Sequence, residues 1–169
     1  MKQHVITVLV LNKSGVLARV TALFARRGFN IDSLVVCSTE NDRYSRMTIV
    51  VTADDEILPQ IVKQLAKLID VKKITEIDPN NAVLRELLMI KLTITPAQRP
   101  EIESMCNIYK AKIIDLSPES VVMELTGEAP KLDAFVGLVS SYGILELTRT
   151  GLSALHRGKE NINNLNTDD

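Results

Sequence analysis

Residues 11–32, LNKSGVLARVTALFARRGFNID, decide the fold, because an apolar strand ends there and a helix begins within a few residues. The preceding run HVITVLVL (4–11) is β-branched and apolar, which predicts a strand covered on both faces. After the lone Gly15 the apolar residues take a helical spacing and form one face, made of Val16, Leu17, Val20, Leu23 and Phe24. Arg26 and Arg27 close the last turn, so Gly28 is expected just beyond the end of the helix.

The chain that follows this stretch completes a six-element unit. Strands are predicted at 30–38, 44–52 and 70–77. A second helix is predicted to begin at the acidic residues 54–56, because acids suit the positive end of a helix dipole. Its expected buried stripe is Ile57, Ile61, Leu65, Leu68 and Ile69. The order β-α-β-β-α-β is the split ferredoxin-like arrangement.

The same order repeats after a turn-rich segment at 78–82. Strands are predicted at 85–94, 111–117, 120–127 and 144–151, and helices at 100–109 and 130–143. The sequence therefore predicts an α+β protein of two ferredoxin-like βαββαβ domains, 1–78 and 83–158, joined by a linker at 79–82. Residues 159–169 are polar and rich in amides, so we expect a disordered tail there.

The composition argues against several classes of protein. Of the 169 residues, 46% are hydrophobic, which suffices for a packed core without disulfides or metals. A formal charge of −1 and an aromatic content of 4% disfavour a nucleic-acid-binding surface. Cys37 and Cys106 have apolar neighbours and no CxxC spacing, so we expect two reduced, packed thiols. Because neither a signal peptide nor a run of about 18 apolar residues is present, we expect a cytoplasmic protein that does not enter a membrane.

The turn from Asn12 to Gly15 could hold a small ligand. A nucleotide is disfavoured, since Walker and Rossmann loops need further glycines that are missing here. The N–H groups of Gly15, Val16 and Leu17 begin a helix, and such donors suit a single carboxylate.

A second asparagine extends this hypothesis. We expect Asn12 and Asn30 at neighbouring sheet ends, on the assumption that the first two strands run beside each other. Their amides could bind an ammonium and a carboxylate, while Val16, Leu17 and Ile31 frame an apolar side chain. This chemistry is that of a small aliphatic amino acid. The residues alone nevertheless favour a plain capped turn, with Asn12 or Ser14 as the N-cap.

The sequence contains few candidate catalytic groups. His4 lies in the first strand and His156 near the tail, and neither has a nearby nucleophile. Asp54, Asp55 and Glu56 are interpreted as a solvated helix start, and no spacing typical of metal ligands occurs. We therefore expect no active site, no metal site and no cofactor in this chain.

Longer motifs then carry a family resemblance. The first half contains VLVLNKSGVLARVTALFARRGFNIDSLVV, SRMTIVV and QIVKQLAKLIDVKKI, and the second RELLMIKL, AKIIDLSPESVVMELTG, KLDAFVGL and ELTRTGLSALHRG. From Val5 to about Gly158 the chain resembles the small, regulatory subunit of acetolactate synthase (acetohydroxyacid synthase). The first domain resembles that family's ACT domain.

The resemblance implies a function. It implies no catalysis by this chain alone, and a partner in the large catalytic subunit, which is expected to hold thiamine diphosphate, Mg and FAD. It implies activation of that subunit and feedback inhibition by valine or another branched-chain amino acid. It also implies a homodimer through paired ACT domains, with the effector at their interface. The implied effector-binding residues are Asn12, Gly15, Val16, Leu17, Asn30 and Ile31.

Two other functions are compatible with the order of predicted elements. RNA-recognition modules share the β-α-β-β-α-β order, but they need aromatic residues on the central strands, where Val, Ile, Met and Thr stand here. A small stand-alone enzyme would need a nucleophile or an acid–base pair. The second half has TPAQRPE (95–101) in place of the Asn–Gly turn, so we expect no second effector site.

Overall fold

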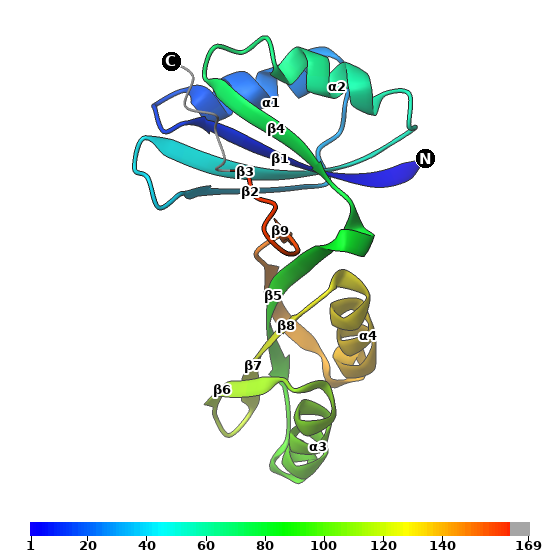
Figure 1. The fold of residues 1–169 in the computed structure, drawn as a ribbon. Helices are drawn as coiled ribbons and strands as arrows, with labels where there is room; N and C mark the ends of the chain where they lie inside the picture. The colour runs from blue at the N-terminus through cyan, green and yellow to red at the C-terminus, as the bar shows by residue number, and fades with distance from the viewer. Residues whose placement is uncertain (163–169) are drawn as a thin grey trace. The chain divides into compact units, whose positions relative to one another are not determined.

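The computed structural model describes residues 1–162, which form two compact units (Figure 1). The first unit contains Met1–Leu84 together with the described chain from Leu152 onward, and the second is Arg85–Gly151. Each unit has an antiparallel sheet with two helices, which confirms the α+β class. No helix of the described residues is long and apolar enough to cross a membrane.

The first unit has the predicted order of elements. These are β1 (Lys2–Leu11), α1 (Val16–Arg26), β2 (Ser33–Ser38), β3 (Tyr44–Ala53), α2 (Leu58–Leu65) and β4 (Val71–Ile77). The strand order across the sheet is β2-β3-β1-β4, so β1 lies between two antiparallel partners. Strands β2 and β4 are the edges of this path.

The core of the first unit lies between one face of the sheet and the two helices. Its members are apolar residues at strand spacing in β1 and β3 and at helical spacing in α1 and α2. They include Ile6, Val8, Val10, Val16, Val20, Leu23, Phe24, Met47, Ile49, Val51, Leu58, Ile61 and Leu65. The helical stripe predicted for α1 is therefore confirmed, except that Leu17 is 43% exposed.

Gly28 ends α1 as predicted. Its φ is +68°, a left-handed conformation that glycine adopts without a Cβ clash. The Gly28 N–H donates to the Ala25 carbonyl, and the Phe29 N–H donates to the Phe24 carbonyl. The rings of Phe24 and Phe29 meet edge to face, 6.4 Å apart. This hydrogen-bond pattern with its apolar contact is a Schellman motif, and it satisfies carbonyls that the helix leaves free.

The start of the second helix differs from the prediction. Residues 54–56 form a turn, in which the Ile57 N–H donates to the Asp54 carbonyl, and α2 begins only at Leu58. Pro59 stands in the first turn, where its missing N–H costs nothing. The helix ends at Leu65, and Ile69 is 86% exposed, so Ile69 was wrongly placed on the buried stripe.

The second unit repeats the order. Its elements are β5 (Ala82–Thr93), α3 (Arg99–Tyr109), β6 (Lys112–Leu116), β7 (Ser120–Gly127), α4 (Ala129–Val139) and β8 (Ile144–Arg149). Two 3₁₀ turns, Pro96–Gln98 and Ser140–Tyr142, flank the helices. The strand order is β6-β7-β5-β8. Its core includes Cys106, where burial raises the pKa of the thiol, whereas Cys37 is exposed and was wrongly expected to be packed.

The segment from Leu152 onward completes the first unit. Strand β9 (Ser153–His156) carries Ala154, which is buried with Leu152, Val5 and Val50. The Leu152 N–H donates to the Ser33 hydroxyl at 3.3 Å, and the Arg46 guanidinium donates to the Ala154 carbonyl. Strand β1 is thus covered on both faces, as its apolar sequence predicted.

Because the chain returns to the first unit at Leu152, the two observed units differ from the expected domains, 1–78 and 83–158. The expected linker contains a 3₁₀ turn, Pro79–Asn81, and β5 begins directly after it. Within the expected tail, Ile162 is 2% exposed and so is buried. The chain returns because Leu152 and Ala154 supply the apolar cover that the back of the first sheet lacks. Residues 163–169, for which disorder was expected, lie outside the described residues.

Candidate effector site

The turn between β1 and α1 contains Gly15 in a left-handed conformation. Gly15 is the N-cap of α1, with φ +81° and ψ −8°, and no side chain caps the helix. The capped turn with Asn12 or Ser14 as N-cap is therefore not formed. The Val16 N–H makes a long 3.3 Å bond to the Lys13 carbonyl, so Val16 is not the free donor that was expected. Among the described residues, no acceptor is seen for the Leu17 N–H, which points out of the first turn.

The two asparagines present the same chemical group. The Asn12 side-chain amide donates to the Asp42 carbonyl at 3.0 Å, and its backbone N–H donates to the Arg43 carbonyl at 2.8 Å. The Asn30 side-chain amide donates to the Asp32 carboxylate at 2.7 Å. Both amide nitrogens thus have an acceptor, and both residues are exposed, so each side-chain oxygen could accept from an ammonium group.

The apolar site residues lie in different surroundings. Val16 is 3% exposed and packs in the core, so its side chain does not face a ligand. Leu17 is the exposed apolar side chain of the turn. Ile31 is half-buried against the core.

An ion pair that the sequence did not reveal braces the turn. The Arg19 guanidinium donates from Nε to Asp70 Oδ2 at 2.8 Å, and its Nη2 lies 2.7 Å from the same oxygen. The Asp70 carbonyl accepts from the Leu11 N–H at 2.8 Å, so Asp70 joins the end of β1 to α1. A Cβ on Gly15 would lie 3.0 Å from Arg19 Nη1. Only the spacing of Arg19, one helical turn after Gly15, could have suggested this contact.

The strand order overturns the expected neighbourhood of Asn12 and Asn30. β3 lies between β1 and β2, so these strands are not adjacent. Asn12 follows the end of β1, where Leu11 pairs with Tyr44. Asn30 precedes the other end, where the Asp32 N–H donates to the Val50 carbonyl. From Tyr44 to Val50 the strand covers about 20 Å at about 3.4 Å per residue. One chain therefore cannot bring both asparagines onto one small amino acid.

The two histidines, which lie outside the turn, form local pairs. His4 is buried, with Nδ1 3.3 Å from Glu76 and Nε2 3.5 Å from Asp55. His156 lies 3.7 Å from Glu160. Within the part of the chain that the structure describes, no three His, Cys, Asp or Glu side chains gather as metal ligands would. The turn and the two asparagines are thus the candidate site.

Comparison with known proteins agrees with this fold. The first unit belongs to the class of ACT regulatory domains: a family model described as the AHAS small subunit-like ACT domain matches residues 6–73. A model described as the small subunit of acetolactate synthase matches residues 85–158. The chain belongs to the acetolactate synthase small-subunit family.

Relatives match over nearly the full length. The probable acetolactate synthase small subunit of Archaeoglobus fulgidus is 51% identical over 94% of this chain and 99% of its own. The acetolactate synthase small subunit of Bacillus subtilis is 42% identical over 94% of this chain and 92% of its own. The crystal structure of the acetolactate synthase small subunit from Thermotoga maritima has a TM-score of 0.88 at 41% identity, and it covers 95% of this chain and 100% of that one.

Proposed function

We propose that this chain is the regulatory subunit of acetolactate synthase. It activates the catalytic large subunit and confers feedback inhibition by valine or another branched-chain amino acid. The thiamine diphosphate, Mg and FAD belong to the large subunit, and this chain supplies no catalytic group. Its place of action is the cytoplasm.

The observation that carries the proposal is the division of the six candidate residues between opposite ends of one sheet. Asn12, Gly15, Val16 and Leu17 lie at one end, and Asn30 and Ile31 lie at the other. A small amino acid can contact both groups only if they come from two chains. The site is therefore complete only in a dimer.

The edge strand β2 offers the pairing that completes it. If β2 pairs antiparallel with its copy across a two-fold axis, the start of one β2 lies beside the end of the other. The end of β2 lies at the same end of the sheet as Asn12, because Ser38 pairs with Ser45 and Leu11 with Tyr44. Pairing through β4 would instead leave both β2 strands at the outer edges.

Each group of the effector then has a partner. The carboxylate accepts from the Leu17 N–H at the positive end of α1. The ammonium donates to the side-chain oxygens of Asn12 and of Asn30 from the second chain. Leu17 and the second chain's Ile31 contact the aliphatic side chain. Binding favours the paired arrangement and changes its coupling to the large subunit through differential affinity.

Reconstitution tests the function. The large subunit is assayed with and without this chain and with increasing valine, using wild type and Gly15→Asp. We expect activation by wild type, and loss of valine inhibition in the variant, because the new carboxylate repels that of the effector. Gly158→Asp is the control, since Gly158 also has a positive φ and open space around it. No activation and no binding of valine, leucine or isoleucine by the wild type would refute the function. Intact inhibition of Gly15→Asp would refute the site.

A mixed dimer tests the two-chain site. Chains with Asn12→Ala and chains with Asn30→Ala are combined, and valine binding is measured by calorimetry. A site shared between chains leaves one wild-type site in each mixed dimer, because both substitutions fall in the other site. We expect wild-type affinity at half the stoichiometry in the mixed dimer after it is purified from the two parent dimers. Uniformly weak binding would place both asparagines in one chain's site.

A further inference from the structure

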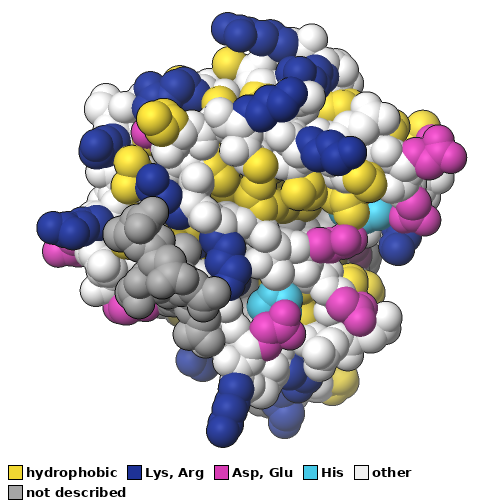
Figure 2. Space-filling model, turned by 45° about the horizontal axis from the view of Figure 1, so that its top comes forward, with side chains coloured by type: hydrophobic (Ala, Val, Ile, Leu, Met, Phe, Trp, Pro, Cys, Tyr) yellow, Lys and Arg dark blue, Asp and Glu magenta, His cyan; other side chains and the backbone are white. Residues whose placement is uncertain are grey.

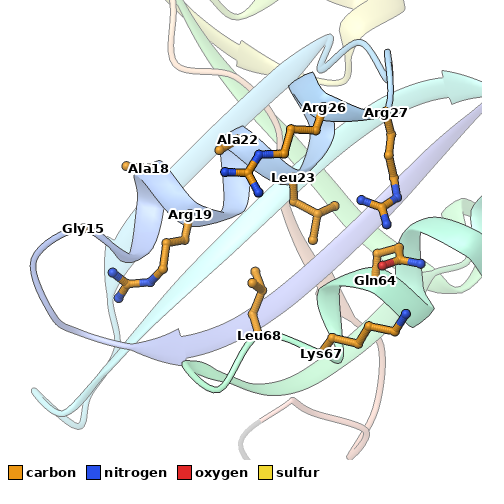
Figure 3. Close-up of a pocket in the computed structure, with 10 residues that line it drawn as sticks. All are labelled: Gly15, Ala18, Arg19, Ala22, Leu23, Arg26, Arg27, Gln64, Lys67 and Leu68. Atoms are coloured by element: carbon orange, nitrogen blue, oxygen red, sulfur yellow. The ribbon is translucent and has the colours of Figure 1, made fainter.

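A groove of about 600 Å³ runs between α1 and α2 on the outer side of the helix layer (Figure 3). Its floor is apolar, from Ala18, Ala22, Leu23 and Leu68, and Gly15 lies at one end. Basic side chains border it: Arg26 and Arg27 extend from α1 and its C-cap, and Lys67 from the chain just after α2. The groove thus combines an apolar floor with basic walls on both sides.

The two helical segments that carry these walls contain basic residues and no acidic ones. Residues 16–27 and 58–68 contain five Lys or Arg and no Asp or Glu, although the whole chain has a formal charge of −1. Arg19 is bound to Asp70, but no ion pair is seen for Arg26, Arg27 or Lys67 among the described residues. Figure 2 shows Lys and Arg side chains around the upper part of the surface, with hydrophobic side chains between them.

The helices of the second unit, by contrast, contain acidic as well as basic residues. In α3, Glu101 and Glu103 accompany Arg99, and in α4 Asp133 accompanies Lys131. Of the described α-helices, only those of the first unit carry basic residues without acidic ones. The field of this surface attracts acidic partners and excludes basic ones.

We propose that this groove docks an acidic, amphipathic segment of the catalytic large subunit. The inference rests on the proposed function, because it takes that subunit as the partner. Basic residues on both walls of an elongated groove fit carboxylates along a peptide, and the apolar floor fits the side chains between them. The groove reaches Gly15, so the docked segment and the effector contact the same helix. Helix α1 therefore couples the two sites.

The double variant Arg27→Glu, Lys67→Glu tests the docking. Its binding to the large subunit is measured at low and high salt, together with the activation of that subunit. We expect at least about tenfold weaker binding at low salt and a smaller dependence on salt than in wild type. Valine binding by the isolated chain is expected to stay unchanged, since neither residue lies in the effector site.

Matched variants control for the change of charge and for the stability of α1. Lys110→Glu, Lys159→Glu makes the same change of charge at exposed positions that do not line the groove, and we expect wild-type binding. Because a Glu at Arg27 disfavours the end of α1, Arg27→Gln, Lys67→Gln is included, with an expected intermediate loss. Thermal unfolding checks that each variant is folded.

Three results would overturn the inference. The groove does not dock the large subunit if the glutamate variant, the glutamine variant and wild type all bind that subunit equally well. A changed sedimentation coefficient of the isolated glutamate variant would assign the groove to contact between copies. If wild type bound no large subunit, the proposed function would fail, and the docking site with it.

Discussion

Gly15 contributes its backbone conformation to the candidate site. Its φ of +81° disfavours every L-residue, and a Cβ would press on the Arg19 guanidinium at 3.0 Å. We predict that Gly15→Ala lowers the free energy of unfolding by about 1–2 kcal/mol, measured by urea denaturation.

Gly137 provides the comparison. It lies inside α4, with no positive φ, and a Cβ added there would meet no atom within 4 Å. Gly137→Ala should therefore raise the free energy of unfolding by about 0.5–1 kcal/mol. Equal effects of the two substitutions would mean that the conformation of Gly15 carries no energetic cost.

At the scale of single residues, turns and helix ends could be predicted from the sequence, whereas burial and long-range ion pairs could not. The turn, Gly15 and the end of the helix at Gly28 follow from residue types alone. The burial of Val16, the exposure of Cys37 and the Arg19–Asp70 pair depend on which elements pack together. No spacing along the chain records that Asp70 reaches the first helix.

Among the elements, β2 is the edge on which the proposed dimer depends. It is short and apolar, and Val36 is 40% exposed. We predict that Val36→Lys weakens the dimer and with it valine binding, because a charge on an edge strand opposes pairing with another strand. Analytical ultracentrifugation measures the change.

Leu138 is the matched control for that substitution. It is 41% exposed in α4, so Leu138→Lys introduces the same charge at similar exposure in the second unit. Its sedimentation should equal that of wild type. A fully dimeric Val36→Lys protein would contradict pairing through β2.

The elements themselves were largely predictable, because long apolar periodicities define them. All eight predicted strands and four predicted helices occur, with shifted ends. The start of α2 was misplaced because acidic residues suit both a turn and a helix start. The order of strands in the sheet was misjudged, since β1 and β2 are joined by α1 yet have β3 between them. Strand β9 was missed because its four residues are too few for a periodic signal.

For the whole molecule, the decisive feature is that the first unit is built from two separate parts of the chain. Leu152 is 7% exposed within the first unit, although it follows the second unit in sequence. We predict that Leu152→Ala costs about 2–4 kcal/mol, because it leaves a cavity against Val5 and Val50. Leu155→Ala, at a residue 59% exposed, should change stability by less than about 0.5 kcal/mol.

Hydrogen exchange locates the effect. In Leu152→Ala the amides of β1 and β3 should exchange faster, while those of β7 should not change. Equal stability of the two variants would show that the returning segment adds nothing to the first unit.

The return of the chain at Leu152 also governs the order of events during synthesis. A ribosome makes the second unit, Arg85–Gly151, in roughly 3 to 13 seconds at about 5–20 residues per second. Throughout that interval the N-terminal sheet has its helices but lacks the cover of its other face. The unit that begins first is therefore finished last, and a chain that ended at Gly151 would have a complete second unit and an incomplete first one.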